Sequence, residues 1–180
     1  MDALQLSDAF AQLATDYSAS ASTDFMSFSL SMLADQLDAS LSLFATVLRN
    51  PTFPTKDFER VKSQRGARAL HQESDPSSVG FVVARRVMNG EGYGAFPSGG
   101  TRSTLERITL DDVKAQYGKL VQPAGSTIVV VGSVDKPTLN AALEAHFGDW
   151  TGSPTGTSAE VATQTAPRGI HPVSYTHLTL

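Results

Sequence analysis

A short alternating segment constrains the fold of this chain more than any other feature. Between residues 26 and 31 apolar side chains alternate with serines, in the order MSFSLS. Because successive side chains of a β-strand point to opposite faces, this period of two predicts a half-buried strand. Asp24 and the serines before it indicate a preceding turn or edge strand.

Segments with the apolar spacing of amphipathic helices occupy most of the chain around this strand. Apolar residues recur at spacings of three and four residues, and proline or capping residues mark the ends of each repeat. The predicted helices cover residues 4–15, 35–49, 55–74, a stretch from 76, a turn at 101–108, a stretch from 110 and one after Pro137. The apolar run STIVVVGSV, residues 126–134, is interpreted as a buried strand. The class is therefore α+β, with an antiparallel β-sheet and helices packed on one face.

Bulk composition excludes several classes of function. The chain has 180 residues, 41% of them hydrophobic and 18% charged, which is typical of a globular protein. A net charge of −4 gives no basic surface for nucleic acid, and the absence of cysteine excludes thiol chemistry and cysteine-based zinc sites. No apolar run approaches the ~20 residues that span a bilayer.

The two ends of the chain differ from its centre. Residues 151–172 are rich in Ser, Thr, Gly and Pro, and we interpret them as a linker toward a missing second unit. Residues 173–180, VSYTHLTL, match one reading frame of a transposase library adapter. We interpret them as a translated sequencing adapter, so that His177 carries no chemistry. We expect the natural protein to continue past residue 172.

Several motifs occur in a familiar order. The segment LADQLDASLSLFATVLRNPTF, residues 33–53, is followed by FERVKSQ, by Asp75-Pro76 and by Tyr93-Gly94. The segments GTRSTLERITLDDV, IVVVGSVD and FGDW come next, the last ending at Trp150. In order and spacing these motifs resemble the pitrilysin/insulinase family of zinc metallopeptidases, also called inverzincins. The resemblance covers about residues 4–150, and we assign residues 1–150 to one α+β domain that lacks its N-terminal strands.

The resemblance implies a fold and a chemistry. Family members have the α+β sheet of LuxS/processing-peptidase-like metallopeptidases, built as paired halves that close around a peptide. The active half binds zinc through an H-x-x-E-H helix and a more distant glutamate, and the glutamate of the motif is the general base. None of the four histidines of this chain lies in such a motif. In the family that motif lies upstream of the point where this chain begins.

The third metal ligand of the family falls in a window that this chain retains. It lies about two turns into the helix that begins with the FER-like segment. Here residues 61–72 read VKSQRGARALHQ, without any carboxylate and with Lys62, Arg65 and Arg68. We therefore predict no catalytic residue, no metal ligand and no cofactor in this segment. The resemblance places zinc in the catalytic half of the parent protein.

Other candidate sites have simpler explanations. His71, Glu73 and Asp75 are interpreted as a polar helix end rather than as a metal cluster. The loop GEGYGAFPSGG lacks the Lys-Ser/Thr that follows a phosphate-binding loop, and no serine lies in a G-x-S-x-G sequence.

Two groups of residues are candidates for contacts with other molecules. Residues 24–27, that is Asp24, Phe25, Met26 and Ser27, lie where an edge strand of active family members pairs with the substrate backbone. Ordinary sheet core is the interpretation we prefer for them. Arg85 and Arg86 form either a solvated helix face or a docking site for the partner half.

The sequence thus predicts a fragment of an insulinase-family peptidase, a non-catalytic half that helps to form the peptide-binding chamber. Its expected partners are a catalytic half, in the same chain or a separate subunit, and a peptide substrate. The alternative is a stand-alone scaffold or interaction domain of the same fold, without enzymatic activity. By analogy with the family, a bacterial periplasm or cell envelope is the expected location. Because neighbouring units would be missing, we expect Leu30, Ile128 and Val130 to be incompletely covered.

Overall fold

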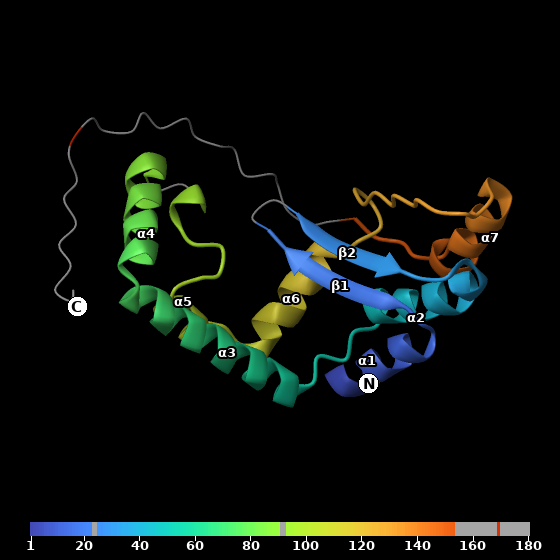
Figure 1. Cartoon of the computed structure of the whole chain (residues 1–180), viewed down its shortest axis with the longest axis horizontal. Coiled ribbons are helices and arrows are strands. Elements are labelled where there is room, and N and C mark those ends of the chain that lie inside the picture. The colour runs from blue at the N-terminus through green and yellow to red at the C-terminus, as the bar shows by residue number, and fades with distance from the viewer. Residues whose placement is uncertain (23–24, 91–92, 154–168, 170–180) are drawn as a thin grey trace. The chain divides into compact units, whose positions relative to one another are not determined.

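The computed structural model of the chain describes residues 1–22, 25–90, 93–153 and 169. Residues 1–58 and 109–153 form one compact unit, unit 1, and residues 59–108 form a second, unit 2. Figure 1 labels the elements along the chain. Unit 1 holds a two-stranded sheet, three longer helices and α1. Their bounds are α1 Ala3–Gln12, β1 Asp16–Ala21, β2 Met26–Ser31, η1 Ala34–Gln36, α2 Leu37–Arg49, α6 Leu110–Leu120 and α7 Lys136–Phe147.

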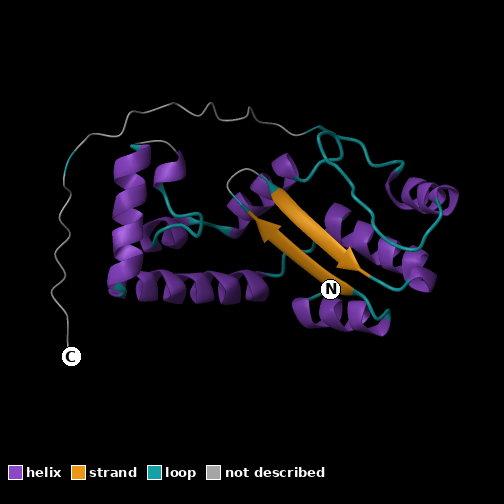
Figure 2. Ribbon diagram, turned by 45° about the horizontal axis from the view of Figure 1, so that its top comes forward, coloured by secondary structure: helices purple, strands orange, loops and turns teal. Residues whose placement is uncertain are grey.

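The two strands form an antiparallel hairpin, drawn as paired arrows in Figure 2. The register pairs Tyr17 with Leu30 and Ala19 with Phe28, so these side chains share one face. The opposite face carries Asp16 and serines. The predicted alternation is therefore confirmed, and the apolar face of the hairpin is the one that helices cover.

A ladder of aromatic rings joins that face to the helices. The ring of Tyr17 stacks on Phe10 of α1, with 5.1 Å between centroids, and meets the edge of Phe44 of α2 at 6.1 Å. Phe44 in turn meets Phe147 at the end of α7 at 6.3 Å. Since aromatic pairs at these separations add to the energy of simple burial, the ladder fixes α1, α2 and α7 on one face of the sheet. The α+β class with helices on one face is thus confirmed.

The predicted strand at residues 126–134 is wrong. This segment is neither strand nor helix, and Ile128, Val129, Val130 and Val131 are exposed by 59%, 81%, 43% and 94%. A strand needs the backbone of a neighbour for its hydrogen bonds, and no described residue pairs with this one. The exposure of Ile128 and Val130, and the half-buried state of Leu30, agree with the expectation of incomplete cover.

Unit 2 is helical. The helix α3, Thr55–Ser74, begins in unit 1 and continues through unit 2, where α4 Pro76–Asn89, η2 Tyr93–Ala95 and α5 Arg102–Arg107 follow. The side chains that are buried in this unit are few and small to medium in size: Ala69, Ala95 and Leu105. None of the described residues of α4 is buried.

Side-chain caps explain where the helices begin. Asp75 accepts a hydrogen bond from the backbone N–H of Ser78 at 2.8 Å and starts α4, whose first residue is Pro76. Asp135 caps α7 in the same way, and Thr109 forms a capping box with Asp112 at the start of α6. These signals are local, which is why the sequence located these helices well. Among the described residues, no helix combines the length and the apolar character that crossing a bilayer requires.

Candidate functional site

The start of β2 and the residue before it carry three of the four residues predicted to contact a peptide strand, namely Phe25, Met26 and Ser27. Phe25 is 66% exposed and Met26 is 36% exposed, and Ser27 is half-buried. Ser22 holds the start of this segment, because its hydroxyl donates to the Phe25 carbonyl at 3.0 Å. Asp24 lies outside the described residues. Within the described chain β2 has a strand neighbour on one side only, so its other edge offers unpaired backbone groups.

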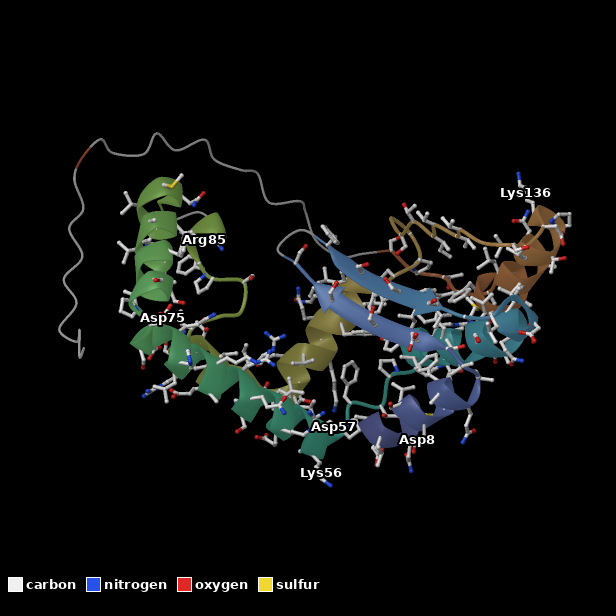
Figure 3. The ribbon with its side chains drawn as sticks, viewed as in Figure 1. Asp8, Lys56, Asp57, Asp75, Arg85 and Lys136 are labelled. Atoms are coloured by element: carbon white, nitrogen blue, oxygen red, sulfur yellow. The ribbon has the colours of Figure 1, made fainter. Side chains whose placement is uncertain are left out.

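Arg85 and Arg86 hold the loop that follows their own helix. The Arg85 Nε donates to the carbonyl of Gly94 at 3.3 Å, and the guanidinium of Arg86 lies 4.8 Å from the centroid of the Phe96 ring. Figure 3 shows Arg85 on α4 beside this loop. Both predicted docking residues are therefore engaged within unit 2, through a backbone acceptor and a cation–π contact.

The basic window of α3 contains one lysine with a structural role. The Nζ of Lys62 donates to the carbonyls of Glu106 and Ile108, at 3.0 and 2.7 Å. These carbonyls lie at the C-terminal end of α5, where the helix leaves acceptors without intrahelical partners and where a cation is favoured. Lys62 thereby fixes α5 against α3. Nothing in the sequence indicated this contact, because the two segments are more than forty residues apart.

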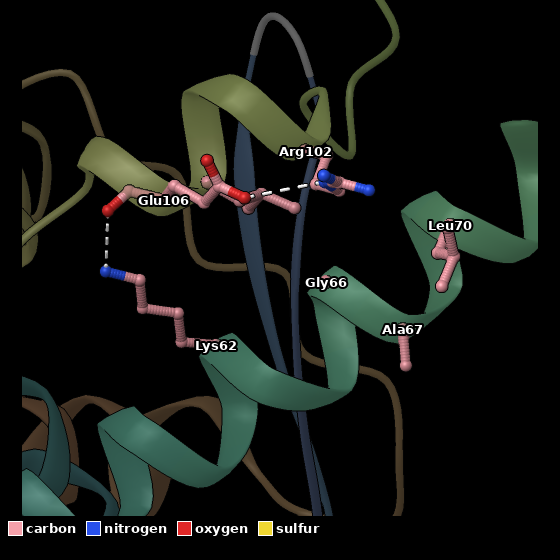
Figure 4. Close-up of a pocket in the computed structure, with 7 residues that line it drawn as sticks. Lys62, Gly66, Ala67, Leu70, Arg102 and Glu106 are labelled. Carbon is pink, nitrogen blue, oxygen red and sulfur yellow. Dashed lines mark hydrogen bonds and ion pairs between the residues drawn. The ribbon is translucent and has the colours of Figure 1, made fainter.

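A small cavity lies between the same two helices, as the close-up in Figure 4 shows. Its volume is about 230 Å³, below the roughly 300–1,000 Å³ of typical ligand pockets. Its polar groups pair with one another, since the Arg102 Nε lies 3.5 Å from Glu106 Oε1. The lining residues are Lys62, Gly66, Ala67, Leu70, Arg102, Leu105 and Glu106. This set contains no nucleophile with an adjacent base, so it offers no catalytic chemistry.

The side chains of α3 do not fit the zinc of the family. A protein zinc site needs three or four His, Cys, Asp or Glu ligands, and no group of three converges among the described residues. Asp75 lies close to His71, but its carboxylate already caps α4. Hydrogen bonds from Ser78, and to a lesser degree the charge of His71, hold the pKa of Asp75 below its ordinary value. Its role is that of a helix cap.

In unit 1 the FGDW motif closes α7 onto α2. The Nη1 of Arg49, the last residue of α2, donates to Asp149 Oδ1 at 2.7 Å and to the carbonyl of His146 at 3.0 Å. The His146 ring lies 2.8 Å from Asp38 of α2. The hydrogen bond from Arg49 is the main reason why the pKa of Asp149 is lowered. Asp149 of the FGDW motif thus has a structural role, because it holds the end of α2.

Two family models match the chain. One is described as Insulinase (Peptidase family M16) and matches residues 1–89, and the other as Peptidase M16 inactive domain and matches residues 107–178. The chain belongs to the insulinase family of peptidases. The second model spans both the residues interpreted as a linker and most of those interpreted as an adapter.

Individual relatives are distant and longer than this chain. A non-peptidase homolog, YmxG of Helicobacter pylori, is 28% identical over 127 residues, which are 68% of this chain and 29% of that protein. The crystal structure of a peptidase M16 inactive domain from Pseudomonas fluorescens has a TM-score of 0.81 at 25% identity, covering 89% of this chain and 39% of that one.

Two further structures share the fold. A protease from Helicobacter pylori has a TM-score of 0.75 at 17% identity, covering 93% of this chain and 39% of that one. The first half of the periplasmic protease PqqL from Escherichia coli has a TM-score of 0.63 at 16% identity, covering 89% and 35%. The chain thus spans less than two fifths of each of these relatives.

Proposed function

We propose that this chain is part of a non-catalytic half of an insulinase-family peptidase and helps to form the chamber that holds the peptide. The observation that carries this proposal is the α3 window, residues 61–72, which has no carboxylate and presents Lys62, Arg65 and Arg68. Cations at these positions oppose the binding of Zn²⁺. The matches to an inactive domain and to a non-peptidase homolog support this reading.

In this proposal zinc and the general base belong to a partner half with an H-x-x-E-H helix. A periplasmic location is compatible with the likeness to PqqL. The open edge of β2 would take a peptide as an additional strand, through main-chain hydrogen bonds. A peptide that is N-methylated at alternate backbone amides should then bind much more weakly than its unmodified form. Equal binding would argue against strand addition.

The decisive experiment uses the complete natural gene and any adjacent gene that encodes an H-x-x-E-H half. We expect peptide hydrolysis only when both halves are present, with zinc held by the partner half alone. His71→Ala in this chain should change neither zinc content nor activity, whereas replacement of a motif histidine should abolish both. Zinc bound to this chain by itself, and lost on His71→Ala, would contradict the proposal.

A stand-alone scaffold is the second candidate, favoured by the similarity to a non-peptidase homolog. The absence of an H-x-x-E-H half from the same gene and its neighbours would support it. Docking through Arg85 and Arg86 is also a proposal. Both side chains hold the loop at residues 94–96. Lysine replacements lose these guanidinium contacts but keep the positive charge, whereas alanine replacements lose both, so a comparison of the two separates docking from loop stability.

A further inference from the structure

Basic charge is concentrated in unit 2. Residues 59–108 carry 8 lysines and arginines and 5 acidic side chains, a net charge of +3, whereas the rest of the chain carries 6 and 13, a net charge of −7. A chain that is acidic overall therefore has one basic region. Segregation of this kind attracts partners of opposite charge.

Within this region Arg65 and Arg68 have no compensating charge among the residues that the structure describes. Both side chains are exposed, and neither forms a hydrogen bond or an ion pair with a described residue. On α3 the positions three and four residues away from them hold no carboxylate, although such positions are the usual places for helical ion pairs. Two like charges three residues apart also disfavour the helix slightly. The described part of the chain thus supplies no partner for this pair.

The helical period places the pair on an open face. Lys62, Gly66 and Leu70 line the cavity beside α5. With 3.6 residues per turn Arg68 lies on the other side of the helix, and Arg65 lies at the margin between the two sides. Val61 lies one turn before Arg65 on this open face and is 40% exposed. The face therefore combines two guanidinium groups with an apolar side chain.

We propose that the face of α3 formed by Val61, Arg65 and Arg68 binds acidic peptide segments. This inference rests on the proposed function, and it names the class of substrate that the chamber favours. Each guanidinium offers planar paired donors that match a carboxylate, and Val61 contacts the aliphatic part of a Glu or Asp neighbour. The charge of the face and of such a peptide are complementary, whereas a basic peptide would be repelled.

The test measures fluorescence anisotropy of a labelled glutamate-rich peptide and of its glutamine counterpart, on the complete natural protein with its partner half. We expect the acidic peptide to bind roughly tenfold more tightly than the glutamine peptide, a preference that weakens as salt increases. The double variant Arg65→Gln/Arg68→Gln should remove the preference. The control Lys56→Gln/Lys136→Gln removes the same charge from exposed positions elsewhere and should keep it.

The outcomes separate the two proposals. Equal binding of both peptides, or an equal loss of preference in the control variant, would overturn the acidic-peptide inference and leave the chamber proposal in place. If neither peptide binds, both proposals are overturned. Because Arg65 and Arg68 are exposed, an unchanged circular dichroism spectrum and melting temperature of the double variant show that a lost preference is not a lost fold.

Discussion

The two units of the chain are stabilised in different ways. Unit 1 buries Phe10, Leu41 and Leu48 and joins its sheet to three helices through stacked and edge-on aromatic rings. Unit 2 buries mainly alanines, and its largest apolar side chains are exposed, with Phe81 at 74% and Met88 at 65%. Its helices are positioned by polar contacts at their ends. The stability of unit 1 therefore depends on apolar packing, whereas that of unit 2 depends on polar contacts at its helix ends. The large apolar side chains of unit 2 stay exposed.

The largest expected difference between the units is the loss of unfolding free energy when one phenylalanine in each is replaced by alanine. Phe10 is 3% exposed and stacks on Tyr17, so Phe10→Ala should lower the free energy of unfolding by about 3–5 kcal/mol. Phe81→Ala, at an exposed position, should change it by less than about 0.5 kcal/mol. Urea unfolding of the natural protein measures both. Similar losses in the two variants would show that unit 2 is covered by another part of the protein.

A buried pair of hydroxyl groups offers a second test of the packing in unit 1. Thr15 Oγ1 lies 2.8 Å from Ser40 Oγ, and Ser40 is fully buried. Thr15→Val leaves the Ser40 hydroxyl without this partner and should cost about 1–3 kcal/mol. The double variant Thr15→Val/Ser40→Ala removes both groups and should recover part of that loss. A double-mutant cycle without coupling would contradict the assignment of this pair to the core.

Tyr117 provides a smaller test of the same unit. Its hydroxyl donates to the carbonyl of Leu48 at 3.0 Å. Burial, with a lesser effect of Tyr17, raises the pKa of Tyr117 to about 12. The raised pKa favours the neutral phenol, so its stabilising effect is complete below the ordinary pKa of about 10 and is lost as the pH rises through about 12. Tyr117→Phe should cost about 0.5–1.5 kcal/mol of unfolding free energy at neutral pH. In a titration followed by tyrosinate absorbance, the variant should lack the rise near pH 12.

The smallest expected effect concerns the cap of α4 in unit 2. The pKa of Asp75 is lowered by its hydrogen bonds from Ser78. Its contribution is therefore present above the ordinary pKa of aspartate and is lost as the pH falls through the lowered value. Asp75→Asn keeps a capping side chain at every pH and should remove this acid sensitivity from the urea midpoint. Asp75→Ala should weaken α4 at neutral pH as well, and an effect equal to that of Asp75→Asn would contradict the capping role.

Local features of the sequence predicted the helices and the alternating strand well. The helix at 55–74 and the break at Asp75-Pro76 were located to the residue, because prolines and caps act on their immediate neighbours. The strand at 26–31 followed from its alternation. Both signals lie within a few residues of the structure that they determine.

Long-range contacts account for what the sequence analysis missed. The run at 126–134 has a composition typical of strands, but whether it pairs depends on a backbone elsewhere. Nothing local indicated that Lys62 caps α5 or that Arg49 binds Asp149, since these contacts join residues 44 to 100 positions apart. That Arg65 and Arg68 have no partner among the described residues also required the structure, because only the structure shows which charges are paired.

The link between Arg49 and the end of α7 also bears on how the chain folds. Arg49 and Asp149 are 100 residues apart, and the whole of unit 2 lies between them in the sequence. Contacts of such high sequence separation form slowly, because a long loop must close first. During synthesis the helices of unit 2 emerge before α7 does, so α2 can form its contacts with α7 only after unit 2 has been made.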